Sequence, residues 1–467
     1  MTTDDVARWA ADFEAFCARF ARYFSRSEPR QQARNYLRGL LSPVQRKNSW
    51  QMAEAVGEPD PASMQHLLYG AVWEADAVGA ELQGFVVEQF GHPQGIAVLD
   101  ESAFVKKGNK SVGVKRQWCS TLGKKENCQV GVFLTYVSPH GHTFLDRRLY
   151  LPQEWCDDPP RRRAAFVPET IRFATKPQLA QEMLEQAWER GVPMRWVTGD
   201  ECYGNQPALR DAIHAHGRDH GLAYVLAISA STHVWRERPA LLPPATKTGG
   251  RPRKHPRLAP EAPASEAVAA VVASWPEESW QRLAVGQGEK GPRLYDWAAA
   301  RVVEYRDGLP AEALWLLARR SLSPPCELAY YFADAPEDTP LATLAEVAGA
   351  RWTIEQCLEE SKGETGLDEY EVRYWNSWHR HITLSIMAHA WLASVRSRER
   401  QAELGGKGAR AAGRAHRPRS APPTGGGAAT RSAVARPEAG LVAVPPADAP
   451  ARPPQPLQTP RCGLVAA

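Results

Sequence analysis

The run Ile96-Ala97-Val98-Leu99-Asp100 is where the sequence changes from helical to β character, and it decides the fold. An apolar run that ends on an acid is typical of a buried strand with a polar group at its carboxyl end. The same arrangement recurs at residues 194–200, where Val197-Thr198-Gly199 lead into Asp200. In open α/β sheets, ligands bind beside the carboxyl ends of the strands. We therefore predict that Asp100 and Asp200 come together at one edge of a sheet.

The segments around these two acids alternate between strand and helix. Turn residues at 138–142 separate two of the β-rich stretches, and apolar periodicity marks the helices. The predicted elements are strands at 96–99, 129–137 and 143–151, a helix at 176–190, a strand at 194–199, a helix at 207–216 and a strand at 223–229. Three strands followed by helix, strand, helix and strand is the order of a ribonuclease-H-like α/β core. We predict that fold class for the centre of the chain.

The regions on either side of this core have different patterns. Helices are predicted at 10–24, 30–41 and 64–85, with another beginning at Ser42-Pro43. Apolar stretches at 315–318 and 328–332 indicate strands, and helices are predicted at 341–363 and 375–395. The predicted domains are a helical domain at 1–90, the first part of the core at 91–231, a β-rich insertion at 232–332, a helical return of the core at 333–400 and a disordered tail at 401–467.

Size and composition limit the class of protein. The chain has 467 residues, of which 43% are hydrophobic, enough for a sizeable core and two or three domains. Because no run of about 18 apolar residues appears and the N-terminus is acidic, we expect no membrane span or signal peptide and predict a cytoplasmic location. The eight cysteines include no C-x-x-C pair, so they indicate neither a disulfide framework nor structural zinc. The net charge of +4 does not by itself indicate a nucleic-acid ligand.

Residues after Glu403 lose the globular character of the preceding sequence. They contain no aromatic residue, their only acids are Glu438 and Asp448, and Ala, Pro, Gly and Arg dominate. Such a segment buries too little apolar surface to fold, which is why the tail is predicted to be disordered. A basic tail that binds DNA and a C-terminus translated out of frame both fit this composition.

A third acid, Glu355, lies on a predicted helix. Arg351, four residues earlier, and Lys362, seven residues later, share its face. An acid between two cations suits a metal ligand whose neighbours contact phosphate groups, although a salt-bridged surface helix has the same pattern. Two strand-borne aspartates and one helix-borne glutamate can hold two Mg²⁺ ions, which stabilise the attacking and leaving oxygens of a phosphoryl transfer. Three neighbouring acids compete for these roles: Glu101, Glu201 and Glu359.

The pattern Arg-x3-Glu-x6-Lys formed by Arg351, Glu355 and Lys362 resembles the signature of bacterial insertion-sequence transposases with a DDE triad, within the DDE endonuclease superfamily. Stretches at 99–108, 116–118, 123–132 and 199–204 resemble one subgroup, insertion-sequence family seven hundred and one, and the resemblance runs from about Glu28 to Ala393. Related transposases often carry a tyrosine three residues before the arginine, where this chain has Ala348. A contact with the transposon end is therefore missing or supplied by another residue.

The resemblance implies an activity and its site. The enzyme would cut the ends of an insertion sequence and transfer their 3′-hydroxyl groups into target DNA in the bacterial nucleoid. Asp100, Asp200 and Glu355 would be the catalytic metal ligands for two Mg²⁺ ions, which Mn²⁺ can replace, while Arg351 and Lys362 would bind the DNA end. The need to pair two ends of double-stranded DNA implies a dimer. A metal-dependent nuclease without strand transfer and an inactive DNA-binding remnant are the alternatives.

Further cations are candidate DNA contacts because the substrate of the predicted acids is polyanionic. One set is spaced four residues apart on a predicted helix, a second lies between the first two core strands, and a third belongs to a Gly-Arg-Pro segment that resembles an AT-hook. Each set also fits an ordinary solvated surface. The predicted DNA-binding residues are Arg30, Arg34 and Arg38, then Lys106, Lys107, Arg116 and Lys124, and finally Arg251 and Arg253.

Overall fold

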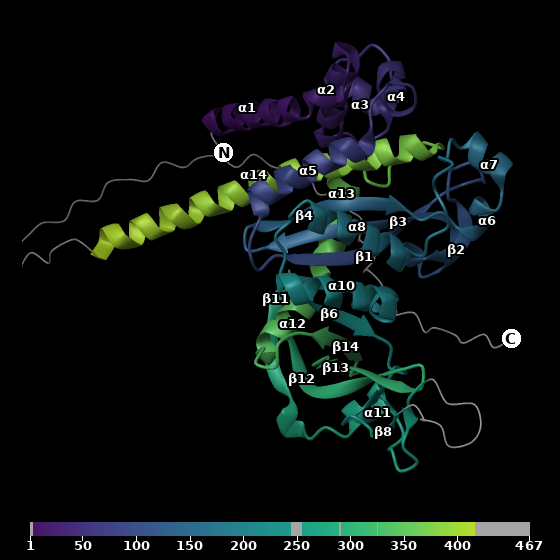
Figure 1. Cartoon of the computed structure of the whole chain (residues 1–467). Coiled ribbons are helices and arrows are strands. Elements are labelled where there is room, and N and C mark those ends of the chain that lie inside the picture. The colour runs from purple at the N-terminus through teal and green to yellow at the C-terminus, as the bar shows by residue number, and fades with distance from the viewer. Residues whose placement is uncertain (1–2, 244–254, 289–290, 325, 416–467) are drawn as a thin grey trace, which may run out of the picture. The chain divides into compact units, whose positions relative to one another are not determined.

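The computed structural model describes residues 3–243, 255–288, 291–324 and 326–415 (Figure 1). Residues 1–397 form one compact unit, and residues 398–467 are assigned to a second. Arg251 and Arg253, two of the predicted DNA-binding residues, lie outside the described residues. Residues 416–467, which make up most of the predicted disordered tail, lie outside them as well.

The described residues contain one large mixed sheet and a second, two-stranded sheet. The small sheet pairs β8 (Leu241–Leu242) with β9 (Arg257–Leu258). The strands of the large sheet are β1 (Ile96–Val105), β2 (Lys115–Cys119), β3 (Lys124–Ser138), β4 (Gly141–Leu149), β5 (Trp196–Gly199), β6 (Ala223–Ile228), β7 (His233–Trp235), β10 (Glu266–Ala267), β11 (Gln281–Gly288), β12 (Gly291–Arg306), β13 (Leu309–Arg320) and β14 (Leu328–Asp334).

The central strands follow the order predicted from the sequence. Strand β3 pairs antiparallel with both β1 and β4, while β5 lies parallel between β1 and β6. The sheet therefore runs β4-β3-β1-β5-β6 through this region. Beyond β6 it continues antiparallel through β14, β13 and β12 to β7, so the strands of residues 233–334 other than β8 and β9 extend the same sheet.

Strand β1 is longer than predicted, and this corrects the expected position of Asp100. The predicted strand at 96–99 covers only the part of β1 that pairs with both β3 and β5. Beyond Leu99, β1 continues to Val105 because β3 remains alongside it, with Asp100 opposite Phe133. Asp100 therefore lies within a strand at the point where its parallel neighbour ends, whereas Asp200 directly follows β5.

The helices lie mainly where the sequence predicts them. Three short 3-10 helices, η1 (Ala21–Tyr23), η2 (Ser120–Leu122) and η3 (Glu277–Ser279), connect other elements. The α-helices are α1 (Thr3–Arg19), α2 (Ser27–Leu41), α3 (Ser49–Val56), α4 (Ala62–Tyr69), α5 (Ala75–Phe90), α6 (Gln153–Cys156), α7 (Pro159–Ala164), α8 (Lys176–Glu189), α9 (Glu201–Gly204), α10 (Pro207–His220), α11 (Val268–Ala273), α12 (Leu341–Gly349), α13 (Arg351–Thr365) and α14 (Trp375–Ala415).

Several predicted helix boundaries are wrong. The helix expected to begin at Ser42-Pro43 begins at Ser49, because the Asn48 side chain accepts hydrogen bonds from the backbone of Trp50 and Gln51 and caps it. The helix predicted at 64–85 is two helices, α4 and α5. The last helix was predicted to end near Val395 but continues to Ala415.

The helix predicted at 341–363 is also divided, between α12 and α13. The break at Ala350 follows Gly349, against which strand β11 packs closely. A Cβ atom at Gly349 would lie only 2.6 Å from the Cβ of Val285, so this approach requires glycine. The consequence is that the helix carrying Glu355 begins at Arg351, one turn before the acid.

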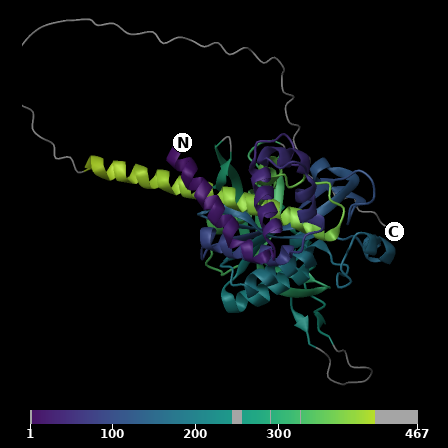
Figure 2. The same cartoon turned by 90° about the horizontal axis from the view of Figure 1, so that it is seen from above.

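Helices cover both faces of the central strands (Figure 1). Helices α5, α13 and α14 contact one face of the β1–β3–β4 region, and α8 contacts the other. Helix α1 crosses α14 where the rings of Phe13 and Trp391 meet edge to face, 5.3 Å between centroids (Figure 2). No helix within the described residues has the length and apolar character needed to cross a membrane.

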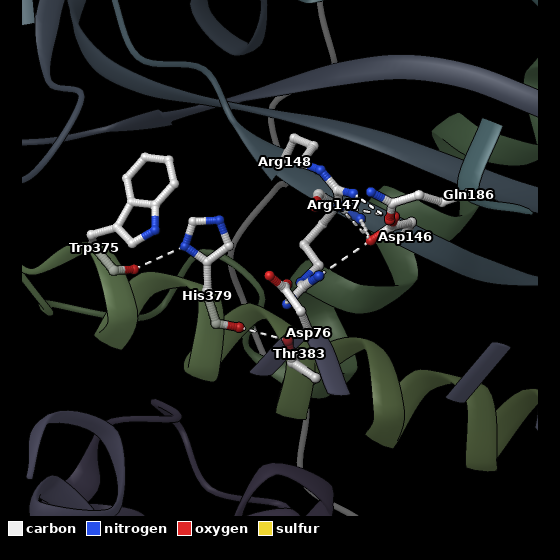
Figure 3. Close-up of polar contacts among 8 residues, drawn as sticks. All are labelled: Asp76, Asp146, Arg147, Arg148, Gln186, Trp375, His379 and Thr383. Carbon is white, nitrogen blue, oxygen red and sulfur yellow. Dashed lines mark hydrogen bonds and ion pairs between the residues drawn. The ribbon is translucent and has the colours of Figure 1, made fainter. Parts of the chain in front are cut away.

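Two adjacent arginines on β4 connect the helices on opposite faces of the sheet (Figure 3). Side chains alternate between the two faces of a strand. Arg147 accordingly donates to Asp76 of α5 at 2.8 Å, and Arg148 donates to Gln186 of α8 at 2.7 Å. Both also bind Asp146, which is buried between them. Arg147, Arg148 and Asp146 therefore connect the sheet to the helices on both of its faces.

Candidate active site

The register of the sheet places Asp100 beside Asp200. The parallel ladder between β1 and β5 runs from the pair Ile96 and Trp196 to the pair Leu99 and Gly199. Asp100 and Asp200 are the next residues along each chain, and neighbouring strands lie only about 4.8 Å apart. The two apolar runs found in the sequence therefore place Asp100 and Asp200 side by side on adjacent strands.

Each aspartate is held by the backbone that follows it. Asp200 is the N-cap of α9, where its side chain accepts a hydrogen bond of 2.9 Å from the Cys202 amide. The Oδ1 atom of Asp100 accepts from the Glu101 amide at 2.7 Å. Helix α9 sits so close to β6 that a Cβ at Gly204 would lie 1.8 Å from the carbonyl oxygen of Ala227. Glycine at this position lets the turn after Asp200 pack tightly against the sheet.

Glu101 joins the two aspartates. One carboxylate oxygen each from Asp100, Glu101 and Asp200 lies within 4.8 Å of the others. Lys176 donates to Glu101 at 2.5 Å and the Tyr203 hydroxyl donates to it at 3.1 Å. These two partners come from the first turn of α8 and from α9, so helix packing fixes the carboxylate.

Glu355 is connected to this group through Arg351. The guanidinium lies 3.4 Å from Oδ2 of Asp100 and 2.6 Å from Oε1 of Glu355. Glu355 is therefore near the aspartates but is not one of the three acids whose oxygens lie together. The pair formed by Arg351 and Glu355 is also the i, i+4 salt bridge that a simple surface helix would make. What distinguishes it is the second contact of Arg351, with Asp100.

The acids of this site are buried and repel one another, and the nearby cations do not neutralise all of their charge. Burial, followed by the charge of Asp200, raises the pKa of Asp100 well above its usual value. Burial and the charge of Glu101 raise the pKa of Asp200 to about 6. Burial alone would lower the pKa of Lys176 and of Arg351, but the nearby carboxylates outweigh it and hold both values above normal. Both cations therefore stay charged, and the acids still repel one another.

The donor set fits a hard divalent cation. Carboxylate oxygens are the ligands that Mg²⁺ and Mn²⁺ prefer, and metal binding requires their ionised form. A cation near Asp100 and Asp200 would offset the repulsion that raises their pKa values. Perturbed, partly buried acids of this kind are typical of functional sites.

Two further residues of α13 lie near these acids. The ammonium of Lys362 lies 5.9 Å from the centre of the Phe104 ring, on the same strand as Asp100, and burial lowers its pKa. Trp352 lies between two guanidiniums, that of Arg351 at 5.9 Å and that of Arg293 at 4.5 Å from its ring centre. Arg293 belongs to β12. Ala348, at the position where related transposases often carry a tyrosine, is buried at the end of α12.

The predicted cations between β1 and β3 have different surroundings. Lys106 donates to the carbonyl oxygen of Tyr370 at 2.7 Å and lies 3.5 Å from the centre of its ring. Burial lowers the pKa of Lys106 to about 8. Lys107, Arg116 and Lys124 are exposed, and Lys124 lies 3.6 Å from Glu126.

Arg30, Arg34 and Arg38, the predicted cations spaced four residues apart, all lie on α2. Arg30 and Arg38 are exposed, while the same helix buries Tyr36, Leu37 and Leu40 on its other side. Arg34 forms an ion pair with Glu14 of α1, and Arg30 donates to the carbonyl of Phe24 at 3.3 Å. Part of the stripe is therefore engaged within the protein.

Lys176 and Tyr203 were not among the candidate residues found in the sequence. Lys176 is the first residue of α8, directly after the Thr175 capping box, and this position alone suggests an ordinary helix start. Tyr203 lies in the stretch at 199–204, and this proximity to Asp200 was the one available signal. Their contacts with Glu101 depend on how α8 and α9 pack, which no local pattern reveals.

Comparisons with known proteins agree with this geometry. Residues 19–292, more than half of the chain, match the family model described as DDE superfamily endonuclease. The matched segment includes Asp100 and Asp200 and ends before Glu355. A protein of Microchaete diplosiphon, described as a probable transposase for insertion sequence element IS701, is 26% identical over 201 residues. That alignment covers 42% of this chain and 48% of the relative, so the chain spans about half the length of the protein it matches.

A solved structure, the NurA nuclease from Sulfolobus solfataricus, aligns with 64% of this chain and 94% of its own. Its TM-score of 0.25 and sequence identity of 8% carry no argument about function. The match to the family model includes both strand-borne acids, and Asp100 and Asp200 lie side by side in the structure. The chain belongs to the DDE superfamily endonuclease family.

Proposed function

We propose that this protein is a DNA transposase that cleaves the ends of an insertion sequence and transfers the resulting 3′-hydroxyl ends into target DNA. The observation that carries the proposal is the meeting of Asp100 and Asp200 on adjacent strands, linked through Arg351 to Glu355 on α13. The strand order β4-β3-β1-β5-β6 supports a ribonuclease-H-like core. Family membership and the likeness to an insertion-sequence transposase support DNA as the substrate.

We assign the metal-binding role to Asp100, Asp200 and Glu355, with two Mg²⁺ ions as the cofactor and Mn²⁺ as a substitute. Bound divalent cations would neutralise charge on the reacting phosphate and activate the attacking oxygen. Asp100 and Asp200 are already together, whereas Glu355 is held by Arg351. Arg351 would leave Glu355 for a DNA phosphate, because a phosphodiester offers the guanidinium the same two-oxygen partner as a carboxylate.

Other residues of the chain hold this arrangement in place. Lys176 and Tyr203 keep Glu101 oriented beside the aspartates, and the amide of Cys202 orients Asp200. We place Lys362 at the DNA end together with Arg351. Because the chain supplies orientation and charge, strand cleavage needs no nucleophilic serine, tyrosine or cysteine.

The remaining assignments concern DNA binding and assembly. We propose that residues 1–90 bind the terminal inverted repeats and that a dimer pairs the two ends. The exposed cations Lys107, Arg116 and Lys124 are the candidate phosphate contacts nearest to Asp100 in the sequence. Arg30 and Arg38 are the corresponding exposed candidates on α2.

The test is a joining assay with purified protein. Duplex DNA carrying the element ends is incubated with supercoiled plasmid and Mg²⁺ or Mn²⁺, and both nicked ends and joined products are measured. We expect joined product from the unmodified protein. Asp100→Asn, Asp200→Asn and Glu355→Gln should each reduce cleavage by at least about 1,000-fold while DNA binding persists, because several kcal/mol of charge stabilisation are lost.

Neighbouring acids provide matched controls. Glu201→Gln and Glu359→Gln alter exposed carboxylates adjacent to Asp200 and one turn beyond Glu355, and both variants should retain activity. Loss of activity in Glu359→Gln together with an active Glu355→Gln would move the third acid by one helical turn. Cleavage without joined product would indicate a nuclease, and DNA binding without any cleavage would indicate an inactive remnant.

A further inference from the structure

A pocket of about 380 Å³ lies between the N-terminal helices and the segment that follows α13. Trp50 of α3 and Tyr69 at the end of α4 line one side, and Arg373 and Tyr374 line the other. Lys47 and Gln65 also contribute to its wall. This volume falls within the range of pockets that hold small organic molecules. The pocket is separate from the acids around Asp100.

The aromatic side chains at this pocket are unusually accessible. Trp50 is 63% exposed, Tyr69 is 58% exposed and Tyr374 is 38% exposed. Phe166, whose ring lies 4.9 Å from that of Tyr374, is 64% exposed. A folding requirement would bury such groups, so several exposed rings around one pocket indicate a binding surface.

The backbone also shows strain at this place. Phe166 has a φ angle of 55°, in the left-handed region that residues other than glycine seldom adopt. The adjacent Ala165 carbonyl accepts a hydrogen bond from the Trp375 amide at 2.9 Å, which fixes the segment against the start of α14. The strained conformation therefore presents the Phe166 ring at the surface beside Tyr374.

The pocket is lined by two cations, Lys47 and Arg373, and two acids, Glu369 and Glu371. Glu369 accepts a hydrogen bond from the Lys47 backbone, whereas Glu371 is exposed. Further cations around the pocket add the positive charge that attracts a phosphate. Arg373 is exposed among the aromatic rings. Lys107 and Lys110, on the adjacent segment, and Arg163, near Phe166, are exposed too.

Both segments that support the pocket continue from elements of the candidate active site. Residues 106–114 follow β1, which carries Asp100, and residues 366–374 follow α13, which carries Glu355. The two segments are joined by hydrogen bonds from the Val112 amide to the Arg373 carbonyl and from Lys106 to the Tyr370 carbonyl.

We propose that this pocket binds one unpaired nucleotide of the DNA on which the enzyme acts. The base would stack on Trp50 and Tyr69, and its phosphate would pair with Arg373. Aromatic rings beside a cation are the usual means of holding single-stranded DNA, since every base offers a flat face. The proposal rests on the proposed function, because it takes DNA as the ligand.

The first test measures binding of the full-length protein to a fluorescein-labelled, 20-residue single strand of thymidylate by anisotropy. Trp50→Ala should weaken this binding by roughly 5- to 100-fold, the effect of losing one stacked base. Arg373→Gln should weaken it as well and increase its resistance to salt. Tyr305→Ala, which removes a 40% exposed ring from β12, is the matched control and should bind normally.

The second test uses oligonucleotides that contain 5-iodouracil, which crosslinks to a stacked aromatic ring under ultraviolet light. Mass spectrometry should find the crosslink at Trp50 or Tyr69. Crosslinks confined to other residues, or equal affinity of the unmodified protein and Trp50→Ala, would overturn the proposal. Circular dichroism establishes that each variant is folded.

The Asp200→Asn variant separates this inference from the proposed function. It should keep the Trp50-dependent binding and lose cleavage. If the unmodified protein does not cleave element ends but still binds through Trp50, the proposed function fails and the pocket assignment stands. If the unmodified protein cleaves element ends and Trp50→Ala binds single-stranded DNA as tightly as the unmodified protein, the pocket assignment fails and the proposed function stands.

Discussion

Asp200 caps α9 and at the same time belongs to a crowded group of carboxylates. The cap needs only a side-chain oxygen, which asparagine also provides. The raised pKa of Asp200, about 6, shows that its charge is unfavourable in the folded protein when no cation is bound. At the scale of single residues, the site therefore sacrifices stability for the capacity to bind metal.

The Asp200→Asn variant should consequently unfold less readily than the unmodified protein in the presence of EDTA. We expect a gain of about 3 kcal/mol at pH 7.5, where the aspartate is ionised in both the folded and unfolded states. Urea denaturation followed by circular dichroism measures it. Adding Mn²⁺ should stabilise the unmodified protein and have little effect on the variant. A destabilised variant in EDTA would contradict this account of the raised pKa.

Lys176 should act on catalysis through Glu101 rather than through the substrate. Removing the ammonium in Lys176→Met leaves Glu101 with Tyr203 alone and adds uncompensated negative charge beside Asp200. Loss of such supporting contacts typically lowers metal affinity or activity by about 10- to 100-fold. The cleavage assay should show a higher Mn²⁺ requirement for this variant. Arg236→Met, which removes an exposed cation paired with Glu266 and far from this group in the sequence, tests whether the loss of any cation has the same effect.

At the scale of elements, β4 is the strand that joins the layers (Figure 3). Arg147 is 1% exposed and binds both Asp146 and Asp76. Arg147→Met would fill the space but remove one of the two cations that bind buried Asp146, which keeps Arg148. We expect a loss of about 1–3 kcal/mol in the free energy of unfolding, measured with urea. Arg22→Met, which removes an exposed arginine paired with Glu81, should cost much less.

The same contact region makes stability depend on pH. Burial and the charge of Arg147 lower the pKa of His379, on α14, to about 4. In the unfolded chain a histidine titrates near 6.5, so the folded state binds fewer protons between these values. Stability attributable to His379 is complete above about pH 6.5 and is lost as the pH falls toward 4. The nearby charges on other elements are Asp76, Arg147 and Arg148.

Urea unfolding at pH 7.5 and 4.5 tests this prediction. The unmodified protein should lose roughly 2–3 kcal/mol more than His379→Gln over this range, because glutamine keeps a donor for the Trp375 carbonyl but does not titrate. Buried His381 and the carboxylates contribute equally to both proteins and cancel in the difference. An identical loss in both proteins would exclude His379 as the source.

Some of these features follow from local sequence and others do not. The apolar runs before Asp100 and Asp200 predict their strands, and the strand order brings the two acids together. The length of β1 was missed because its last residues are stabilised by β3 alone. Gly349, just before the break at Ala350, packs closely against Val285, a residue far away in the chain, and no local pattern reveals this contact. The contacts of Glu101 with Lys176 and Tyr203 likewise arise only when α8 and α9 pack.

At the scale of the whole molecule, most of the described strands of residues 233–334 are part of the large sheet itself. Strand β14 pairs with β6, and β13 and β12 follow it. Replacing residues 231–336 by a short Gly-Ser linker would therefore leave β6 as an uncovered edge, a common cause of aggregation. We expect this variant to aggregate in size-exclusion chromatography with light scattering, whereas the unmodified chain should not. A soluble, folded product would show that these strands are a dispensable attachment.

Arg351 holds Asp100 and Glu355 with one guanidinium, and this has a consequence for the resting protein. Under the proposed function, Glu355 paired with this internal counter-ion would attract free cations only weakly. DNA phosphates would draw the guanidinium away and so release the carboxylate. The protein would then have little activity while no DNA is bound, which would limit unintended cleavage.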